Sequence, residues 1–282
     1  MTDTTSNKRD AVDASEIRSA VRQRYGRIAE TETGCCGPDI ATESTTCCGS
    51  ETSTSDPSRE LSKQLGYADE DLDAVVDGAN LNLGCGNPTA IAGLNAGETV
   101  LDLGSGGGFD CFLAAREVGS AGQVIGVDMT PEMVERAREN AQQHDAVHVE
   151  FRLGEIEHLP VPNTSVDVII SNCVINLSPN KQQVFHEAYR VLRPGGRLAI
   201  SDVVLTAELP ADIRVDLSSV AGCVGGAASI PALEGMLHEA GFGDVAIEPK
   251  SESAAFIREW SDDHDLSDYL VSATIEGKKP VD

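Results

Sequence analysis

The middle of the chain alternates short apolar runs with longer stretches in which apolar residues recur every three or four positions. The short runs predict buried strands, and the longer amphipathic stretches predict helices. Strands joined by helices of this length imply right-handed crossovers and a mostly parallel sheet with helices on both faces, which is an α/β fold. The runs that predict strands are TVLDL (99–103), QVIGVDM (123–129), VHVEFRLG (147–154), VDVIISNC (166–173), GRLAISDVVL (196–205), DVAIEPK (244–250) and YLVSATIEGKKP (269–280).

The same pattern divides the chain into three parts. Residues 1–57 hold a predicted helix and then a segment rich in Ser, Thr, Gly and Glu that predicts a flexible loop. Residues 58–205 hold the first five predicted strands, and residues 206–282 hold a long connection and the elements that complete the sheet. Long connections of this kind usually carry function. The predicted helices are 11–30, 58–66, 109–119, 131–144, 180–192 and 231–242.

The composition narrows the possible partners. With 282 residues, 40% of them hydrophobic, the chain can bury a sizeable core. A formal net charge of −25 disfavours nucleic-acid binding, which needs clustered Lys and Arg. We find no apolar stretch that predicts a membrane helix or a signal peptide, so we expect a cytoplasmic protein. The acidic excess is spread along the chain, which suggests adaptation to a salty cytoplasm; simple solubility is the plainer alternative.

A glycine-rich turn, VLDLGSGGGFD, joins the first of these strands to a helix. Its glycines permit a sharp turn and close approach to a ligand, and the helix that follows offers free N–H groups to a negative charge. A dinucleotide-binding loop would carry a third glycine where Phe109 stands. Asp128 ends the second strand, where an acid can accept hydrogen bonds from ribose hydroxyls. The pattern therefore predicts a nucleotide-type site that matches the dinucleotide motif poorly, and Asp128 fits either kind of cofactor.

This turn resembles the D-x-G-x-G motif of class I S-adenosylmethionine methyltransferases, and residues 166–202 resemble their fourth strand, helix and fifth strand. The resemblance implies a Rossmann-like sheet with an antiparallel last strand. It also implies that Gly104 and Gly106 line the amino-acid end of S-adenosylmethionine, that Asp128 holds the ribose, and that Met129 packs on the adenine. The full set of cofactor-binding residues that it implies is Asp102, Gly104, Ser105, Gly106, Asp128, Met129, Glu155 and Ile156 (at the adenine edge) and Asn172 (facing the methionine part or the substrate).

Three of the eight cysteines stand where ligands of such a fold bind. Cys173 follows the fourth strand, and in open α/β sheets ligands lie outside the carboxyl ends of the strands. Cys85 and Cys223 are each bracketed by glycines, in loops that can close over the same pocket. A lone cysteine is most often a small core residue, which is the interpretation we adopt for Cys111. Three converging thiols without a fourth ligand suit zinc poorly and suit a soft trivalent centre such as arsenic(III).

At this point the resemblance becomes specific. The segments GANLNLGCGNP, VIGVDMTPEM, RLGEIEHLPV, SNCVINLSP and YRVLRPGGRLAISD together resemble the arsenite S-adenosylmethionine methyltransferase family. The resemblance implies that Cys85, Cys173 and Cys223 bind arsenite, or its thiol conjugate, as substrate. It also implies that arsenic is returned to the trivalent state by formation of a protein disulfide, which thioredoxin or a small thiol then reduces.

Three points stay open at the level of sequence. The pairs Cys35-Cys36 and Cys47-Cys48 can serve that redox cycle, hand over arsenite, or have no role. One alternative function is a methyltransferase for a small organic acceptor, which would have the same sheet but would not use the thiols. Another is a metalloid-binding sensor that binds arsenite and S-adenosylmethionine without turnover.

Overall fold

The computed structural model describes residues 13–30, 57–76, 78–144, 146–210, 213–214, 216–261 and 264–281. The adjacent cysteines Cys35-Cys36 and Cys47-Cys48, whose possible roles are discussed above, lie outside these residues. Within them, eight strands form one sheet in the order β3-β2-β1-β4-β5-β8-β7, with β6 paired to β5 beside this path. The strands are β1 (Thr99–Leu103), β2 (Gln123–Asp128), β3 (Val149–Leu153), β4 (Val166–Asn172), β5 (Leu192–Leu205), β6 (Ala228–Ser229), β7 (Gly243–Lys250) and β8 (Leu270–Lys278).

The strand directions confirm the predicted fold class. Strands β1 to β5 pair in parallel, whereas β8 runs antiparallel to both of its neighbours, β5 and β7. The last strand is therefore the antiparallel one, as the resemblance implies. The domain boundaries expected after residues 57 and 205 stay predictions.

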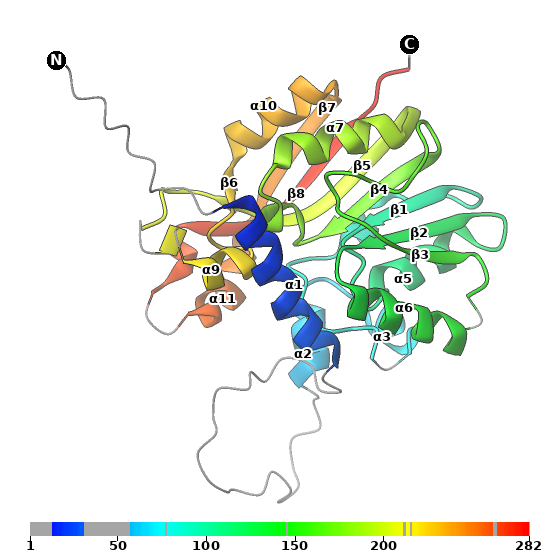
Figure 1. The fold of residues 1–282 in the computed structure, drawn as a ribbon, viewed down its shortest axis with the longest axis horizontal. Helices are drawn as coiled ribbons and strands as arrows, with labels where there is room; N and C mark the ends of the chain where they lie inside the picture. Colours follow the sequence, from blue (N-terminus) through cyan, green and yellow to red (C-terminus); the bar gives the residue numbers. More distant parts are fainter. Residues whose placement is uncertain are drawn as a thin grey trace, which may run out of the picture.

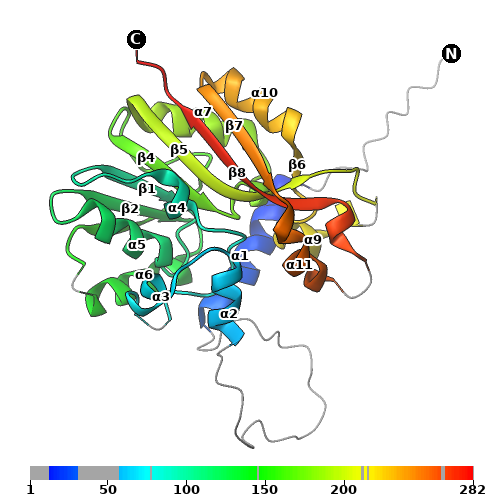
Figure 2. The same cartoon turned by 180° about the vertical axis from the view of Figure 1, so that it is seen from behind.

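Helices cover both faces of the sheet (Figures 1 and 2). Adjacent strand residues point to opposite faces. Val100 of β1 therefore packs in one apolar cluster with Phe112 of α5, and Leu101 packs in the other cluster with Phe185 of α7. The α-helices are α1 (Ala14–Glu30), α2 (Pro57–Gln64), α3 (Asp69–Asp73), α4 (Pro88–Ala92), α5 (Phe109–Val118), α6 (Pro131–Gln143), α7 (Lys181–Val191), α9 (Leu217–Ala221), α10 (Ile230–Ala240) and α11 (Ala254–Ile257). Single 3₁₀ turns are η1 (Ile175–Leu177), η2 (Ser251–Ser253), η3 (Arg258–Trp260) and η4 (Leu266–Asp268).

Local chemistry sets the element ends and corrects two expected boundaries. Helix α7 begins one residue later than predicted, because the Asn180 side chain accepts a hydrogen bond from the Gln183 N–H and so caps the helix. Strand β5 begins at Leu192 instead of Gly196, because Leu192 already pairs with Val166 ahead of an irregularity in the ladder. Pro131 opens α6 and Gly241 closes α10 in a left-handed conformation, as the sequence pattern indicates.

Helix α1 crosses the edge of the sheet where the parallel strands end (Figure 1). Its Val21 and Tyr25 pack against residues of the larger apolar cluster. The N-terminal helix is thus part of the ligand-binding edge. None of the helices in the part of the chain that the structure describes combines the length and apolarity needed to cross a bilayer.

Candidate active site

A cavity opens at the carboxyl ends of β1, β2 and β4, the edge where the sequence places a ligand. Helix α1 closes its outer side with Arg18, Val21 and Tyr25. The sequence-predicted residues that line this cavity are Asp102, Gly104, Ser105, Gly106, Asp128, Met129, Ile156, Asn172 and Cys173.

The glycine turn has the conformation that its sequence indicates. Gly104 has φ 71°, a backbone conformation that residues with side chains rarely adopt. A Cβ at this position would also lie 2.3 Å from Cγ2 of Val174, so both the backbone and the packing exclude a side chain. The N–H of Gly106 donates to one carboxylate oxygen of Asp128 at 3.0 Å, and the N–H of Thr130 donates to the other at 2.9 Å. Burial raises the pKa of Asp128, and these backbone hydrogen bonds oppose the rise. The turn and Asp128 thus hold one another in place.

Two buried carboxyl groups lie beneath the turn. Asp102 accepts a hydrogen bond from the Cys111 thiol at 3.2 Å, and Asp110 accepts one from the Tyr67 hydroxyl at 2.7 Å. Burial raises the pKa of Asp102 well above its ordinary value, and the neighbouring Asp110 adds to the rise. Burial also raises the pKa of Asp110 to about 6. A cation placed between the two carboxyl groups would relieve this cost.

Asn172, at the end of β4, joins the cavity to the loop that carries Cys85. Its side-chain oxygen accepts from the Cys85 N–H at 3.0 Å. Its amide nitrogen lies within hydrogen-bonding distance of the Gly86 carbonyl (2.8 Å), the Tyr67 hydroxyl (3.0 Å) and the Asp110 carboxylate (3.2 Å). The Asn172 side chain therefore fixes the position of the Cys85 backbone relative to the cavity.

The glycines that bracket Cys85 are required by this packing. A Cβ at Gly84 would lie 2.5 Å from Nδ2 of Asn172, and a Cβ at Gly86 would lie 2.0 Å from Oγ of Ser201. The Gly-Cys-Gly pattern thus lets the Cys85 loop lie directly against Asn172 at the end of β4 and Ser201 within β5.

The structure joins two of the three predicted cysteines through their sulfurs, and the third, Cys223, contacts the backbone of Cys173. Cys85 and Cys173 form a disulfide with their Cα atoms 5.8 Å apart. The Cys223 thiol is free and buried, and its Sγ donates to the Cys173 carbonyl at 2.8 Å. Cys111 is fully buried in α5, in agreement with its interpretation as a core residue.

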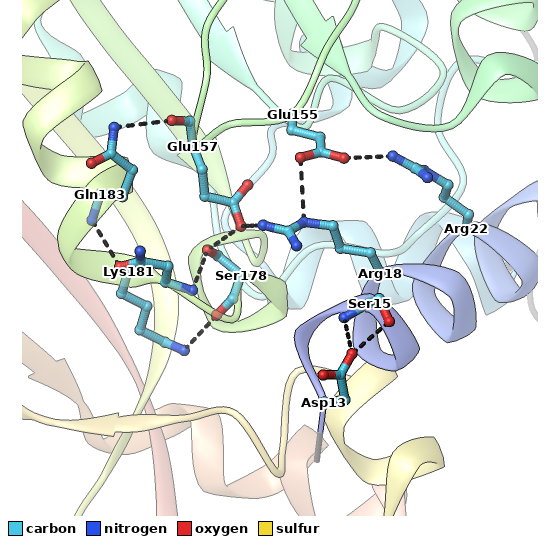
Figure 3. Close-up of polar contacts among 10 residues, drawn as sticks. Asp13, Ser15, Arg18, Arg22, Glu155, Glu157, Ser178, Lys181 and Gln183 are labelled. Atoms are coloured by element: carbon cyan, nitrogen blue, oxygen red, sulfur yellow. Dashed lines mark hydrogen bonds and ion pairs between the residues drawn. The ribbon is translucent and has the colours of Figure 1, made fainter. Parts of the chain in front are cut away.

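Glu155 departs from the arrangement that the resemblance implies. Its carboxylate is not part of the cavity lining and pairs with Arg18 Nε at 3.3 Å and Arg22 Nη2 at 2.6 Å, both on α1 (Figure 3). Glu157 lines the cavity instead, and it accepts from Ser178 Oγ at 2.8 Å and pairs with Arg18 at 3.3 Å. The assignment of Glu155 to the adenine edge stays a prediction.

Asp202 is a site residue that sequence reasoning missed. One of its carboxylate oxygens lies within 4.8 Å of the Sγ atoms of both Cys85 and Cys173. It accepts hydrogen bonds from the Ile175 N–H and the Asn176 side chain, each at 2.9 Å. Burial raises the pKa of Asp202 to about 6, although backbone N–H donors, that of Val203 foremost, and the positive charge of Lys181 oppose the rise. An acid within an otherwise apolar strand, in the motif LAISD, is the signal that could have drawn attention to it.

Comparisons with known proteins agree with this geometry. Residues 94–241 match a family model described as a methyltransferase domain. The chain is 56% identical to the arsenite methyltransferase of Halobacterium salinarum over 95% of its own length and 68% of that protein. It is 35% identical to the arsenite methyltransferase of Mus musculus over 76% of its length, but spans only 55% of that relative.

Among solved structures, an arsenic(III) S-adenosylmethionine methyltransferase from Chlamydomonas reinhardtii superposes with a TM-score of 0.57 at 33% identity. The match covers 79% of this chain and 73% of that one. Fold and comparisons together define a class I, S-adenosylmethionine-dependent methyltransferase. Within that class, the chain belongs to the arsenite methyltransferase family.

Proposed function

We propose that this chain transfers methyl groups from S-adenosylmethionine to trivalent arsenic that is bound by Cys85, Cys173 and Cys223, and so detoxifies arsenite. One observation carries the proposal: Cys173 lines the cofactor cavity, its sulfur is bonded to that of Cys85, and the buried Cys223 thiol contacts its backbone carbonyl. A methyltransferase for an organic acceptor has no use for such a cluster.

The polar groups of the cavity fit the proposed cofactor. Ser105 Oγ is buried and has no hydrogen-bond partner among the described residues, so it is free to bind a ligand. Asp102 and Asp110 offer negative charge to the amino group of the methionine part, and Asp128 offers a carboxylate to the ribose. Met129 and Ile156 supply apolar surface for the adenine. In this assignment Glu155 acts indirectly, by holding α1 over the cavity.

The chemistry of arsenic suits the thiol cluster. Neutral arsenite exchanges three hydroxyls for three thiols and releases three waters, so no net charge is buried. Arsenic bound in this way keeps a lone pair, and S-adenosylmethionine supplies the electrophilic methyl group that this lone pair attacks. The residues act by holding the two reactants close together, an effect worth up to about 7 to 11 kcal/mol in favourable cases.

The observed disulfide supports the redox step. Methyl transfer raises arsenic from the trivalent to the pentavalent state. Two thiolates that leave arsenic as a disulfide return two electrons to it, and Cys85 and Cys173 are placed to form that bond. We propose that thioredoxin or a small thiol then reduces the disulfide.

The thiols and the net charge indicate the cell compartment and the salt concentration in which the protein works. A cycle that needs free thiols requires a reducing compartment, so we propose that the protein works in the cytoplasm. The net charge of −25 supports adaptation to high salt and argues against nucleic acid as a partner.

The test is to incubate the reduced protein in high salt with S-adenosylmethionine and arsenite and to separate the arsenic species by chromatography. We expect methylated arsenic from the parent and none from Cys173→Ser, which should still bind the cofactor when measured by calorimetry. A folded parent that binds cofactor and arsenite but yields no methylated arsenic would point to a sensor. A parent that binds the cofactor and not arsenite would point to an organic acceptor.

A further inference from the structure

The loop that carries Cys223 meets the segment after Cys173 at two points. The first is the hydrogen bond from Cys223 Sγ to the Cys173 carbonyl at 2.8 Å. The second is a backbone contact, because Gly226 lies so close to η1 that a Cβ on it would stand 2.1 Å from the Asn176 carbonyl oxygen. A side chain cannot fit at that distance, so this contact admits only glycine.

The two contacts respond differently when the sulfur of Cys223 binds a substrate. The hydrogen bond needs the thiol proton, which the sulfur gives up when it bonds to arsenic. The contact between Gly226 and Asn176 involves backbone atoms alone, so it does not depend on the state of the sulfur. It can therefore hold the loop in place both before and after arsenite binds.

The Asn176 side of this contact is firmly held. Its buried side-chain amide donates to Oδ1 of Asp202 at 2.9 Å and to the Val203 carbonyl at 2.7 Å. The other carboxylate oxygen of Asp202 accepts from the Ile175 N–H at 2.9 Å. Because satisfied buried polar networks rigidify the structure around them, η1 is fixed to β5.

The loop of Cys223 is the side that needs placing. Helix α9 ends at Ala221, and Cys223 follows with φ 68°. Residues 222–226 read GCVGG, and three glycines in five residues allow many backbone conformations. The direction of this loop is therefore set by the surface on which it packs.

We propose that Gly226 is a positioning residue: its backbone docks on the Asn176 carbonyl and so places the Cys223 thiol beside Cys173 as the third arsenic ligand. This inference rests on the proposed arsenite methylation and deepens it. A methyl group added at residue 226 would push the loop off η1, and arsenic bound to all three sulfurs would have to pull the loop back against that strain.

The test is a double-mutant cycle of Gly226→Ala and Cys223→Ser in the full chain, reduced with a phosphine. Gly226 does not have a positive φ, so alanine adds a methyl group there without left-handed backbone strain. Arsenite dissociation constants come from equilibrium dialysis with arsenic counted by mass spectrometry, and cofactor affinity comes from calorimetry. The cycle also subtracts arsenite bound by cysteines other than Cys223.

We expect Gly226→Ala to weaken arsenite binding about five- to 150-fold, which corresponds to the usual strain from overpacking, with cofactor affinity unchanged. In the Cys223→Ser background the same substitution should have no further effect. The equilibrium between the Cys85–Cys173 disulfide and dithiothreitol should be the same in the parent and in Gly226→Ala, because η1 and these two cysteines stay in place.

Gly235→Ala is the matched control. Gly235 is exposed on α10, where a Cβ would meet no atom within 4 Å. The same substitution at that position should change neither the arsenite affinity nor the cofactor affinity.

Equal arsenite affinity in the parent and in Gly226→Ala would overturn the inference. So would a loss that persists in the Cys223→Ser background, or a change in cofactor affinity or in the disulfide equilibrium, since the methyl group would then disturb the site as a whole. If the parent binds cofactor and fails to bind arsenite at all, the proposed function itself fails, and the two failures are told apart.

Discussion

Cys173 and Cys223 adopt a backbone conformation that residues with side chains rarely adopt. Their φ angles are 56° and 68°, in the left-handed region that glycine favours. Strain of this kind costs on the order of 1–3 kcal/mol and persists where the surrounding structure enforces it. At Cys173 the left-handed turn comes directly after β4, and it keeps the thiol beside the Cys85 loop.

We therefore predict that Cys173→Gly is more stable than Cys173→Ala by about 1 kcal/mol, although glycine has the higher entropy in the unfolded chain. Both variants lack the thiol and the disulfide, so their difference isolates the backbone term. Urea unfolding measures it. The matched pair Cys111→Gly and Cys111→Ala, inside α5, should show the opposite order because alanine is favoured in a helix. An alanine variant at position 173 that equals or exceeds the glycine variant in stability would contradict the strain.

The residues of the site could be predicted only in part, for a physical reason. Cys173 and Asn172 follow an apolar run, so the end of a buried strand is visible in the sequence. Glu155 and Glu157 lie two apart after β3 with nothing in the pattern to tell them apart, and only the packing of α1 separates their roles. Tyr25 and Asp202 reach the site from parts of the chain distant from the glycine turn, which no local period reveals.

At the level of elements, the strands of the sheet and most of the helices follow from periodicity, whereas the docking of α1 does not. An amphipathic pattern shows that a helix has an apolar face, and leaves open which surface that face covers. Here the choice is made by Val21 and Tyr25, which meet the cavity, and by ion pairs from Arg18 and Arg22 to the loop after β3.

We predict that Glu155→Gln weakens S-adenosylmethionine binding roughly two- to fivefold by loosening α1, since partly exposed ion pairs contribute about 0.2 to 1 kcal/mol each. Calorimetry measures the affinity. Arg22→Ala should have a similar effect, and the double variant should lose less than the sum of the two, because both substitutions break the same contact.

Glu150→Gln serves as the matched control for this prediction. It breaks a pair of similar geometry, with Arg152 at 2.7 Å, on β3 and away from α1, and it should leave cofactor affinity unchanged. Fully additive effects of Glu155→Gln and Arg22→Ala would mean that Glu155 contacts the adenine directly, as the family resemblance implies.

Across the whole molecule, charge sets two opposing responses to salt. A net charge of −25 makes the folded chain repel itself, and salt relieves this by shortening the screening length from about 10 Å at 0.1 M to about 3 Å at 1 M. Salt also weakens exposed ion pairs such as Arg22–Glu155. Each such pair contributes at most about 1 kcal/mol, so relief of the summed repulsion should dominate stability.

We therefore predict that the unfolding temperature rises as KCl increases from 0.1 to 2 M, with most of the rise below 1 M, where screening changes fastest. Circular dichroism of dilute protein at pH 7 measures it. The same series near pH 4.5, close to the sequence pI of about 4.4, is the control, because the net charge is then almost zero and the rise should largely vanish. An unfolding temperature that does not change with KCl at pH 7 would contradict this prediction. The acidic surface would then serve solubility alone. An equal rise at both pH values would assign the effect to general exclusion of salt from the protein surface, and not to the charge of this chain.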